Sequence, residues 1–390
     1  MDFTISEEQR AMKNLVRDYM KSEQTLAWMK EAHETQEYPR AFMRDVSTYG
    51  FLGMNIEEKY AGMNMSFLDA LLVFEEFAYA SIPFSLNILV QNSLFGFALQ
   101  QFGTAAQKEK YLPRIAQGKL FGCFANTEPS AGTDAKNIST RAEPVKGKWV
   151  LNGEKHFCTS ASVAGVAVVF ARTSMRGAGH PGITAFLVEL GPTAAGISVK
   201  NQSKNAQYGS VLCAITLDNV ECAMEDILGR VETGWNVCER TFLHSRLWIA
   251  MQGVGAARRA LDVTLDYTLQ RNTFGKPIFD HQHISSELAR IDTMIQAARL
   301  LTLHAAHQEM TDPAQPELAA MASRAKYLAT EVAEMAALHY YRFSGGLSVT
   351  KEWSAAQHLL DSLVLPIYEG PNEIQLQIIA NHLKRTVRFR

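Results

Sequence analysis

The spacing of apolar and polar positions changes twice along this chain of 390 residues. From residue 6 to about 118, apolar residues recur at the spacing of one buried helix face. The segment 66–80 predicts a strong, largely buried helix, and 104–118 predicts another that Pro113 interrupts. The first part of the chain, residues 1–118, is therefore expected to be an α-helical domain.

A period of two, typical of β-strands, replaces the helical spacing in the middle of the chain. Residues 148–160 predict a hairpin with its tight turn at Asn152-Gly153. The stretches "VAVVFAR", "ITAFLVE" and "VLCAITL" predict further short strands, separated by Gly, Pro and Asn. Residues 119–232 are expected to form a small β-barrel-like domain of roughly six to eight strands.

Long helical patterns return after residue 233. They cover residues 234–271, 283–310 and 316–343, and only short links join them. Long helices with short connections favour an antiparallel bundle. We therefore expect residues 233–390 to form a four-helix bundle, and the whole chain to be an α+β protein that is mainly α.

Composition narrows the class of protein only a little. Apolar residues make up 47% and charged residues 20% of the chain, and the net charge is −2, so nothing favours nucleic acid or an acidic membrane. The five cysteines show no CxxC spacing, which fits a reducing compartment. The acidic start of the chain is unlike a signal peptide, and the longest apolar stretches look too short to span a bilayer. The expected location is the cytoplasm.

Several candidate motifs are better explained by packing or by solvation. "GVGAA" at Gly253 lacks the third glycine of a dinucleotide fingerprint and lies inside a helical pattern. His304, His307 and Glu309 have no further ligand nearby, whereas zinc needs three or four. We expect no metal site.

Four loops are each unremarkable when taken alone, and the last one places a carboxylate just ahead of a helix. They are "CFANTEPSAGTDA" (123–135), "RNTFGKP" (271–277), "FSGGL" (343–347) and "PIYEGPNEIQ" (366–375). In the last loop Glu369 precedes Gly370 and Pro371, and Asn372 is a candidate N-cap for the helix that follows. Loop geometry alone does not explain why the chain places a carboxylate beside a glycine, just ahead of a helix.

Taken in this order, the loops make the sequence resemble the acyl-CoA dehydrogenase family over nearly the whole chain. "FANTEPSAGTD" is similar to that family's flavin and substrate loop, and "LNGEKHFCTS" to its hairpin beside the flavin. "RNTFGKP" and "FSGG" are similar to segments that reach the adenosine diphosphate part of the flavin, the former in a neighbouring subunit. "IYEGPNEIQ" is similar to the catalytic loop, and residues 345–369 align without a gap.

The resemblance implies a role for individual residues. It implies that Glu369 is catalytic and that Thr133, His244, Arg246 and Gly370 bind the substrate. It also implies a set of FAD-binding residues: Phe124, Asn126, Thr127, Gly132, Thr133, Phe157, Cys158, Thr159, Arg271, Phe274, Gln282, Arg342, Phe343, Ser344, Gly345, Gly346, Pro371, Asn372 and Glu373.

The chemistry that the resemblance implies is α,β-dehydrogenation of an acyl-CoA thioester to a trans-2-enoyl-CoA. Glu369 would remove the α-proton while a hydride leaves the β-carbon for the flavin, and the electrons would pass to an electron-transfer flavoprotein. Some relatives carry the base one position before the family arginine. Ser245 occupies that position here and cannot serve as the base.

The sequence also departs from the family pattern. Phe157 replaces a tryptophan, Asn126 an apolar residue, and Arg342 a glutamine, while Gln357 and Leu360 replace two arginines. Residues 204–210 differ from the family's Lys-Met-Gly stretch. These changes lie in the regions that contact the flavin phosphates and neighbouring subunits. The resemblance implies that the subunits form a homotetramer, a dimer of dimers.

Three other functions use the same fold. They are an enoyl-CoA reductase, a dehydrogenase of carrier-protein thioesters, and a flavin monooxygenase, which has no use for the carboxylate of Glu369. A scaffold protein without flavin is a fourth. A glutaryl-type relative carries an arginine near the position of Ser85, so a glutaryl substrate is disfavoured here. The sequence does not define the acyl group otherwise.

Overall fold

A layer of helices forms the N-terminal part of the computed structural model, which describes residues 5–175, 177, 181–191 and 194–387. Its helices are α1 (Glu7–Lys21), α2 (Glu23–Thr35), α3 (Arg40–Thr48), α4 (Phe67–Ala80), α5 (Ile82–Leu89), α6 (Phe97–Phe102) and α7 (Ala105–Ala116). The Ser6 side chain accepts from the Gln9 N–H, and the Gln9 side chain accepts from the Ser6 N–H, which is a capping box.

One stretch of this layer is longer and more apolar than the sequence analysis allowed. A π-helical segment, Val90–Gly96, joins α5 to α6, so that Ile82–Phe102 continues over 21 residues. By length and composition it could cross a membrane, so the expectation that every apolar stretch is too short is wrong. The apolar window of this helix is completely buried within the protein, which is also the property of a core helix.

Helix α7 also differs from expectation. It does not stop at Pro113 but continues to Ala116. Proline removes a single N–H donor, and the next turn still forms, because the Gln117 N–H donates to the Pro113 carbonyl at 3.1 Å.

An eight-stranded sheet forms the middle of the chain, with the order β6-β7-β3-β2-β4-β5-β8 and with β1 paired to β4. Its strands are β1 (Gly122–Ala125), β2 (Arg141–Val145), β3 (Lys148–Thr159), β4 (Val166–Arg172), β5 (Ile183–Glu189), β6 (Ile197–Asn201), β7 (Leu212–Cys222) and β8 (Ile227–Leu228). The β1–β4 pair is parallel. Strand β1 follows α7 in the chain and leads from the helical layer into the sheet.

The tight turn of the predicted hairpin lies elsewhere. Lys146 and Gly147, both with positive φ, connect β2 to β3. Asn152 and Gly153 instead lie within β3, where the register against β7 shifts. A Cβ on Gly153 would lie 2.5 Å from the Thr140 hydroxyl, so the glycine belongs to a bulge that the residue just before β2 approaches closely.

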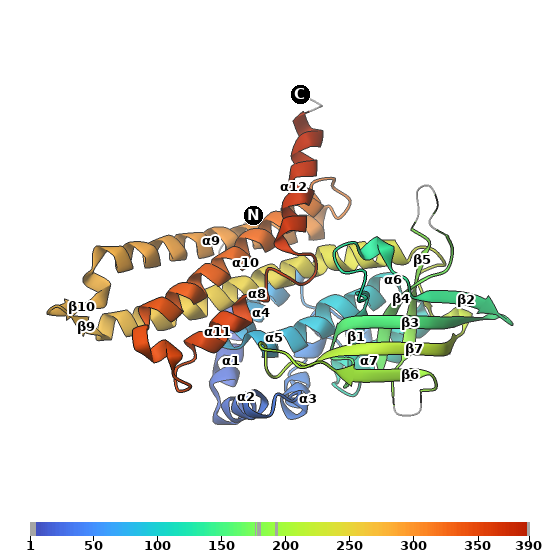
Figure 1. Ribbon diagram of the computed structural model, residues 1–390, viewed down its shortest axis with the longest axis horizontal. Helices are drawn as coiled ribbons and strands as arrows, with labels where there is room; N and C mark the ends of the chain where they lie inside the picture. The colour runs from blue at the N-terminus through green and yellow to red at the C-terminus, as the bar shows by residue number, and fades with distance from the viewer. Residues whose placement is uncertain (1–4, 176, 178–180, 192–193, 388–390) are drawn as a thin grey trace.

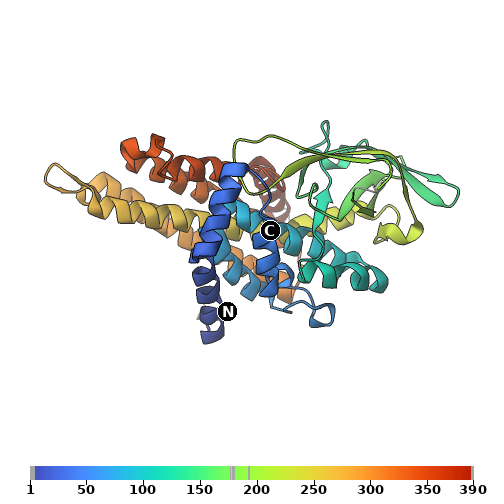
Figure 2. The same ribbon diagram turned by 90° about the horizontal axis from the view of Figure 1, so that it is seen from below.

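Long helices make up the C-terminal bundle. They are α8 (Gly234–Gln270), α9 (Gln282–Thr311), α10 (Leu318–Phe343), α11 (Ala355–Ser362) and α12 (Asn372–Val387), with the small hairpin β9 (Asn272–Thr273) and β10 (Lys276–Pro277) between α8 and α9. Figures 1 and 2 show α8 running from this hairpin, at one end of the molecule, to the sheet at the other. Helix α8 therefore connects the bundle to both other parts.

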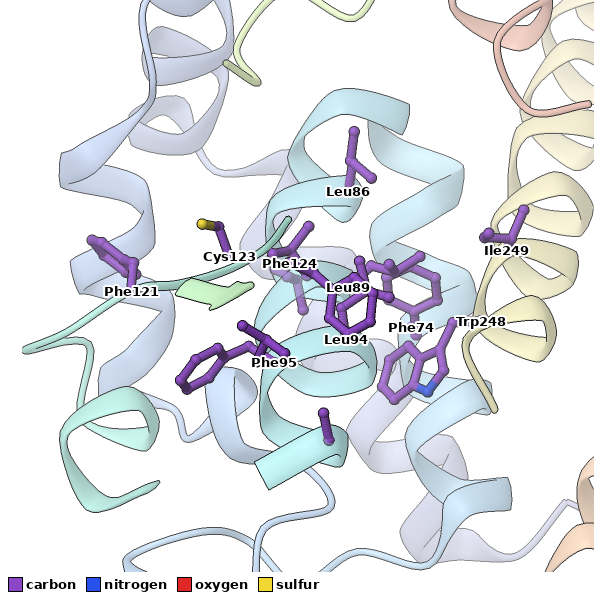
Figure 3. Packing of buried hydrophobic residues seen from close by; sticks show 14 of the residues in the cluster. Phe74, Leu86, Leu89, Leu94, Phe95, Phe121, Cys123, Phe124, Trp248 and Ile249 are labelled. Carbon is purple, nitrogen blue, oxygen red and sulfur yellow. The ribbon is translucent and has the colours of Figure 1, made fainter. Parts of the chain in front are cut away.

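The core is continuous across the three parts. Figure 3 shows Phe74 of α4, Leu89 of α5 and Trp248 of α8 close to Phe124 of β1. The rings of Phe74 and Trp248 lie 4.9 Å apart between centroids. This packing holds α8 rigidly against the layer from which the sheet begins.

Candidate active site

Glu369 lies in the connection between α11 and α12, in a backbone conformation that few residues adopt. Its φ is 54°, and that of Gly370 is 91°. A Cβ on Gly370 would lie 2.8 Å from Gln375 Nε2, so only glycine fits at this position without a shift. Two consecutive left-handed residues turn the chain sharply just before α12, and strain of this kind is typical of functional sites.

The Glu369 carboxylate has an unusual electrostatic environment. Its Oε2 atom is inaccessible and has no hydrogen-bond partner among the described residues. Burial raises the pKa of Glu369 to about 8, against the opposing effect of the Arg246 and Lys326 cations. A carboxylate with a pKa in this range, and with an oxygen left free, can accept a proton near neutral pH.

Arg246 of α8 is the second charged group at this site. A Cβ on Gly370 would lie 3.7 Å from Arg246 Nη2, which places the guanidinium beside the loop. Burial lowers the pKa of Arg246, whereas Glu369 raises it, and within the described chain the Arg246 Nε atom lacks a hydrogen-bond partner. The structure thus brings together Arg246, Glu369 and Gly370, three residues named from the sequence.

Lys326 is a third charged group, and it is not among the site residues predicted from the sequence. It lies on α10, is fully buried, and its ammonium donates to the carbonyls of Pro366 and Gly370 on either side of Glu369. The only signal was its position in an alanine-rich stretch, at the spacing of the buried Ala322 and Ala329.

A polar chain begins at Tyr368, the residue before the candidate base. Its hydroxyl donates to Gln252 Oε1 at 2.5 Å, and Gln252 Nε2 donates to Ser85 Oγ at 2.9 Å. Gln252 and Ser85 are fully buried. Near the position where a glutaryl-type relative is expected to carry an arginine, this chain thus has a buried serine that accepts a hydrogen bond.

Asn372 does not behave as the predicted N-cap. It is the first residue of α12, and its Oδ1 accepts from Lys326 Nζ at 2.9 Å. Its Nδ2 donates to Glu331 at 2.8 Å. Pro371 and Glu373 flank it at the start of the helix, and FAD binding by these three residues stays a prediction.

A buried ion pair positions the first loop named from the sequence. Lys155 Nζ lies 2.7 Å from Glu128 Oε1 and 3.1 Å from the Asn126 carbonyl, and both side chains of the pair are buried. Glu128 also accepts from the N–H of Thr140 at 2.9 Å. The loop that carries Thr127, Gly132 and Thr133 is therefore tied to strand β3, while Phe124 lies on β1.

The second predicted flavin segment presents an aromatic ring to the outside. Phe157 is 59% exposed, with a φ of 56°. Cys158 is fully buried, and FAD binding by this residue stays a prediction. Thr159 ends β3 and is partly exposed. An exposed aromatic ring in a left-handed conformation, where the register of β3 against β7 shifts, offers a surface for stacking.

The remaining predicted flavin residues gather at the far end of the bundle. Phe274 is 96% exposed in the hairpin after Arg271, and its ring lies 6.2 Å from that of His281, just before Gln282. Phe343 at the end of α10 lies near His283 at the same ring distance, 6.2 Å. Arg342 and Ser344 adjoin Phe343, and a Cβ on Gly345 or Gly346 would meet nothing within 4 Å. Figures 1 and 2 place this end away from the sheet of the same chain.

His244 faces a different environment from that of its neighbour Arg246. Its ring is stacked between Phe67 and Phe97, with centroids 4.1 and 3.9 Å away. The indole N–H of Trp248 donates to His244 Nε2 at 3.1 Å, and Nδ1 lies 3.3 Å from Glu309. Both ring nitrogens are therefore engaged, and substrate binding by His244 stays a prediction.

Two departures from the family pattern are linked through Asp361. Asp361 accepts from Gln357 Nε2 at 2.7 Å and from the backbone N–H of Gln207, which lies in the unusual 204–210 segment. Burial raises the pKa of Asp361 to about 6, although the Gln207 N–H lowers it. The Asp361 carboxylate thus joins this segment to α11, and Leu360 of the same helix is 41% exposed.

Comparison with known proteins agrees with this geometry. Family models for acyl-CoA dehydrogenase match in three parts: the N-terminal domain at residues 6–119, the middle domain at 123–220 and the C-terminal domain at 232–384. An acyl-CoA dehydrogenase of Bacillus subtilis (strain 168) is 34% identical over 97% of this chain and 98% of its own. The caffeyl-CoA reductase-Etf complex subunit CarC of Acetobacterium woodii is also 34% identical, over the same shares of the two chains.

Solved structures give the same result. Butyryl-CoA dehydrogenase from Megasphaera elsdenii superposes with a TM-score of 0.92, at 31% identity, over 98% of this chain and 100% of that one. A glutaryl-CoA dehydrogenase from Mycobacterium smegmatis in complex with FADH2 gives 0.89, at 27% identity, over 97% and 95%. The fold and the site define a flavoprotein oxidoreductase. The chain belongs to the acyl-CoA dehydrogenase family.

Proposed function

We propose that this protein is an FAD-dependent acyl-CoA dehydrogenase that converts an acyl-CoA thioester into a trans-2-enoyl-CoA. The observation that carries the proposal is Glu369: a carboxylate with a free buried oxygen and a pKa raised to about 8, in the loop similar to the family's catalytic loop. A structural carboxylate in that position would be expected to have its oxygens paired.

The residues present fit FAD. Phe157 offers an exposed aromatic face, and the space around Gly345 and Gly346 is open to a bulky group. The residues that would hold the cofactor are those of the 124–133, 157–159, 271–282 and 342–346 segments. When bound, the flavin supplies the acceptor for the hydride that leaves the substrate's β-carbon.

The chain's own residues supply the proton chemistry. Glu369 takes the proton from the α-carbon, and Gly370 leaves room for the acyl chain to approach. The backbone N–H of Glu369 donates no hydrogen bond within the described residues, so it is free to donate to the thioester carbonyl. This donor stabilises the negative charge that develops on the carbonyl oxygen as the proton leaves.

The electron acceptor follows from the relatives. An electron-transfer flavoprotein is the partner we propose, because one relative is a subunit of a reductase-Etf complex. That relative also keeps the reductase direction open, since the same residues serve both directions.

We further propose a cytoplasmic location, which is supported by five cysteines that are all free and buried.

The experiment is anaerobic mixing of the purified FAD-loaded protein with a panel of acyl-CoA thioesters, followed by flavin absorbance. At least one thioester should bleach the flavin. Glu369→Gln keeps the shape of the side chain and removes the base, so bleaching should slow by at least about a hundredfold, and exchange of the α-proton with deuterated solvent should stop.

The matched control is Glu109→Gln, on the exposed face of α7. It should leave the rate unchanged. Bleaching of the Glu369→Gln protein at the wild-type rate would show that another group is the base. A protein that neither binds FAD nor reacts with any thioester would contradict the proposed function.

A further inference from the structure

Lys326 is a buried cation whose hydrogen bonds all go to the segment that carries Glu369. Its Nζ atom donates to the carbonyls of Pro366 at 2.9 Å and Gly370 at 3.1 Å, and to Asn372 Oδ1 at 2.9 Å. An ammonium group has three N–H donors, so this set uses all of them. The three acceptors bracket Glu369, before and after it in the chain.

The acceptors are themselves held by other groups, which makes the bracket a network. The Pro366 carbonyl also accepts from the Asn372 N–H at 3.0 Å, and the Gly370 carbonyl accepts from Gln375 Nε2 at 2.8 Å. The hydroxyl of Thr330, one turn after Lys326 on α10, lies 3.1 Å from Asn372 Oδ1. These bonds close the 366–372 segment over α10 and hold its left-handed turn in place.

Burying the Lys326 cation costs free energy, because the charge leaves water without a close carboxylate partner. Burial lowers the pKa of Lys326 to about 7. Glu369 has the strongest effect that raises this pKa, Arg246 lowers it, and Glu373 and Glu331 raise it less. Within the described residues no salt bridge to Lys326 is found, in contrast to the buried Lys155. A lysine kept without a close carboxylate partner, among alanines that could pack equally well, requires an explanation.

We propose that Lys326 is a positioning residue for proton abstraction by Glu369: its ammonium group fixes residues 366–372 around the base and faces the carboxylate with a positive charge. This inference rests on the proposed function. Lys326 touches neither substrate nor cofactor in this role. It sets where the carboxylate lies and how readily it ionises.

The charge effect has a definite sign. The groups that face Glu369 are Arg246 and Cys238 of α8, Lys326 of α10 and the adjacent Tyr368. Of these, Arg246 and Lys326 favour the ionised carboxylate. Removing the Lys326 charge should therefore raise the pKa of Glu369 further, so that the acid limb of the flavin-reduction profile moves to higher pH.

The test compares three variants of the FAD-loaded protein by anaerobic stopped-flow reduction against acyl-CoA concentration and pH. Lys326→Met removes the charge and all three donors. Its limiting rate should fall about 10- to 100-fold, the effect expected of a base displaced by about 1 Å, while the affinity for acyl-CoA is unchanged. Lys326→Gln keeps two donors without charge, so part of the rate should return while the shifted pH profile remains.

Thr330→Val is the matched control, because it disturbs the same network without changing any charge. It should leave the pH profile in place. If Lys326→Met does not fold, Lys326→Gln decides the matter alone. Wild-type rate and pH profile in the Lys326 variants would overturn the proposal, whereas a wild-type protein that no thioester reduces would overturn the proposed function and this inference with it.

A measurement without turnover separates the charge effect from catalysis. The apo proteins are melted with and without Glu369→Gln, in the wild-type and the Lys326→Gln backgrounds. If the ammonium favours the carboxylate, Glu369→Gln should raise the melting temperature more in the Lys326→Gln background. Equal increases in the two backgrounds would show that the two groups are not coupled.

Discussion

At the scale of single residues, the free carboxylate oxygen of Glu369 is a cost to the fold. Burial holds the pKa of this group near 8, well above the ordinary value of 4.5. Between these two values the unfolded chain has lost the proton and the folded chain retains it. The free energy of unfolding is therefore not reduced by Glu369 below pH 4.5, and it falls as the pH rises from 4.5 toward 8.

We expect Glu369→Gln to stabilise the apo protein in a pH-dependent manner. Glutamine has no charge to bury, so at pH 8 the variant should unfold at a higher temperature, with a gain of at least about 1 kcal/mol. Near pH 4.5, where the folded glutamate is already neutral, the gain should vanish. Thermal melts at the two pH values check this, and a pH-independent difference would contradict the raised pKa.

At the scale of elements, the ion pair Lys155–Glu128 ties a loop to a strand. Burial alone would raise the pKa of Glu128, but the Lys155 ammonium and the hydrogen bonds from Ser139 and Thr140 lower it to about 2. The sign is opposite to that of Glu369. Ionised Glu128 contributes to the free energy of unfolding above its ordinary pKa of 4.5, and this contribution is lost as the pH falls toward 2.

Glu128→Gln should destabilise the protein by about 3–5 kcal/mol, because it leaves the Lys155 cation buried without its partner. Weaker FAD retention should follow, since the predicted flavin loop loses its attachment to β3. Glu221→Gln, which breaks the exposed pair with Lys148 in the same sheet, is the control and should cost less than about 1 kcal/mol. Denaturant melts and flavin fluorescence of the filtrate measure both effects, and equal costs would refute the role of the buried pair.

At the scale of the whole molecule, one chain leaves predicted flavin residues at two distant ends and leaves apolar surface uncovered. Helix α12 projects from the body of the chain (Figure 1), with Leu376 and Leu383 about half exposed. Val349 and Ile367, outside α12, are also apolar and more than 60% exposed. A symmetric oligomer would cover such residues and bring the far hairpin of one chain to the flavin of another.

We expect a homotetramer in solution, a dimer of dimers, as measured by light scattering. The double variant Leu376→Glu, Leu383→Glu places two charges on one face of α12 and should reduce the measured mass. Leu26→Glu, at a leucine of α2 that is 52% exposed, should not. A wild-type monomer that retains its flavin would contradict the assembly and the shared flavin site.

The sequence alone determined the order of helices, strands and helices, the long bundle, the loop that carries Glu369 and the family. These depend on local periodicity and on residues that are close along the chain. It misplaced the β2–β3 turn, since the positive-φ pair Lys146-Gly147 competes with Asn152-Gly153 and only the approach of Thr140 selects the bulge. It also placed an interruption at Pro113, through which α7 continues, and it judged every apolar stretch too short to span a bilayer, although Ile82–Phe102 is long enough.

Only the tertiary structure decided what surrounds the base. Lys326 reaches acceptors 40 to 46 positions away along the chain, and Tyr368 reaches Gln252 across 116 positions. No periodicity or propensity encodes such pairs, because they arise when α8 and α10 pack against the loop before α12. The raised pKa of Glu369 has the same origin, since burial and two cations from separate helices act on a carboxylate that in the sequence has only Gly370 and Tyr368 beside it.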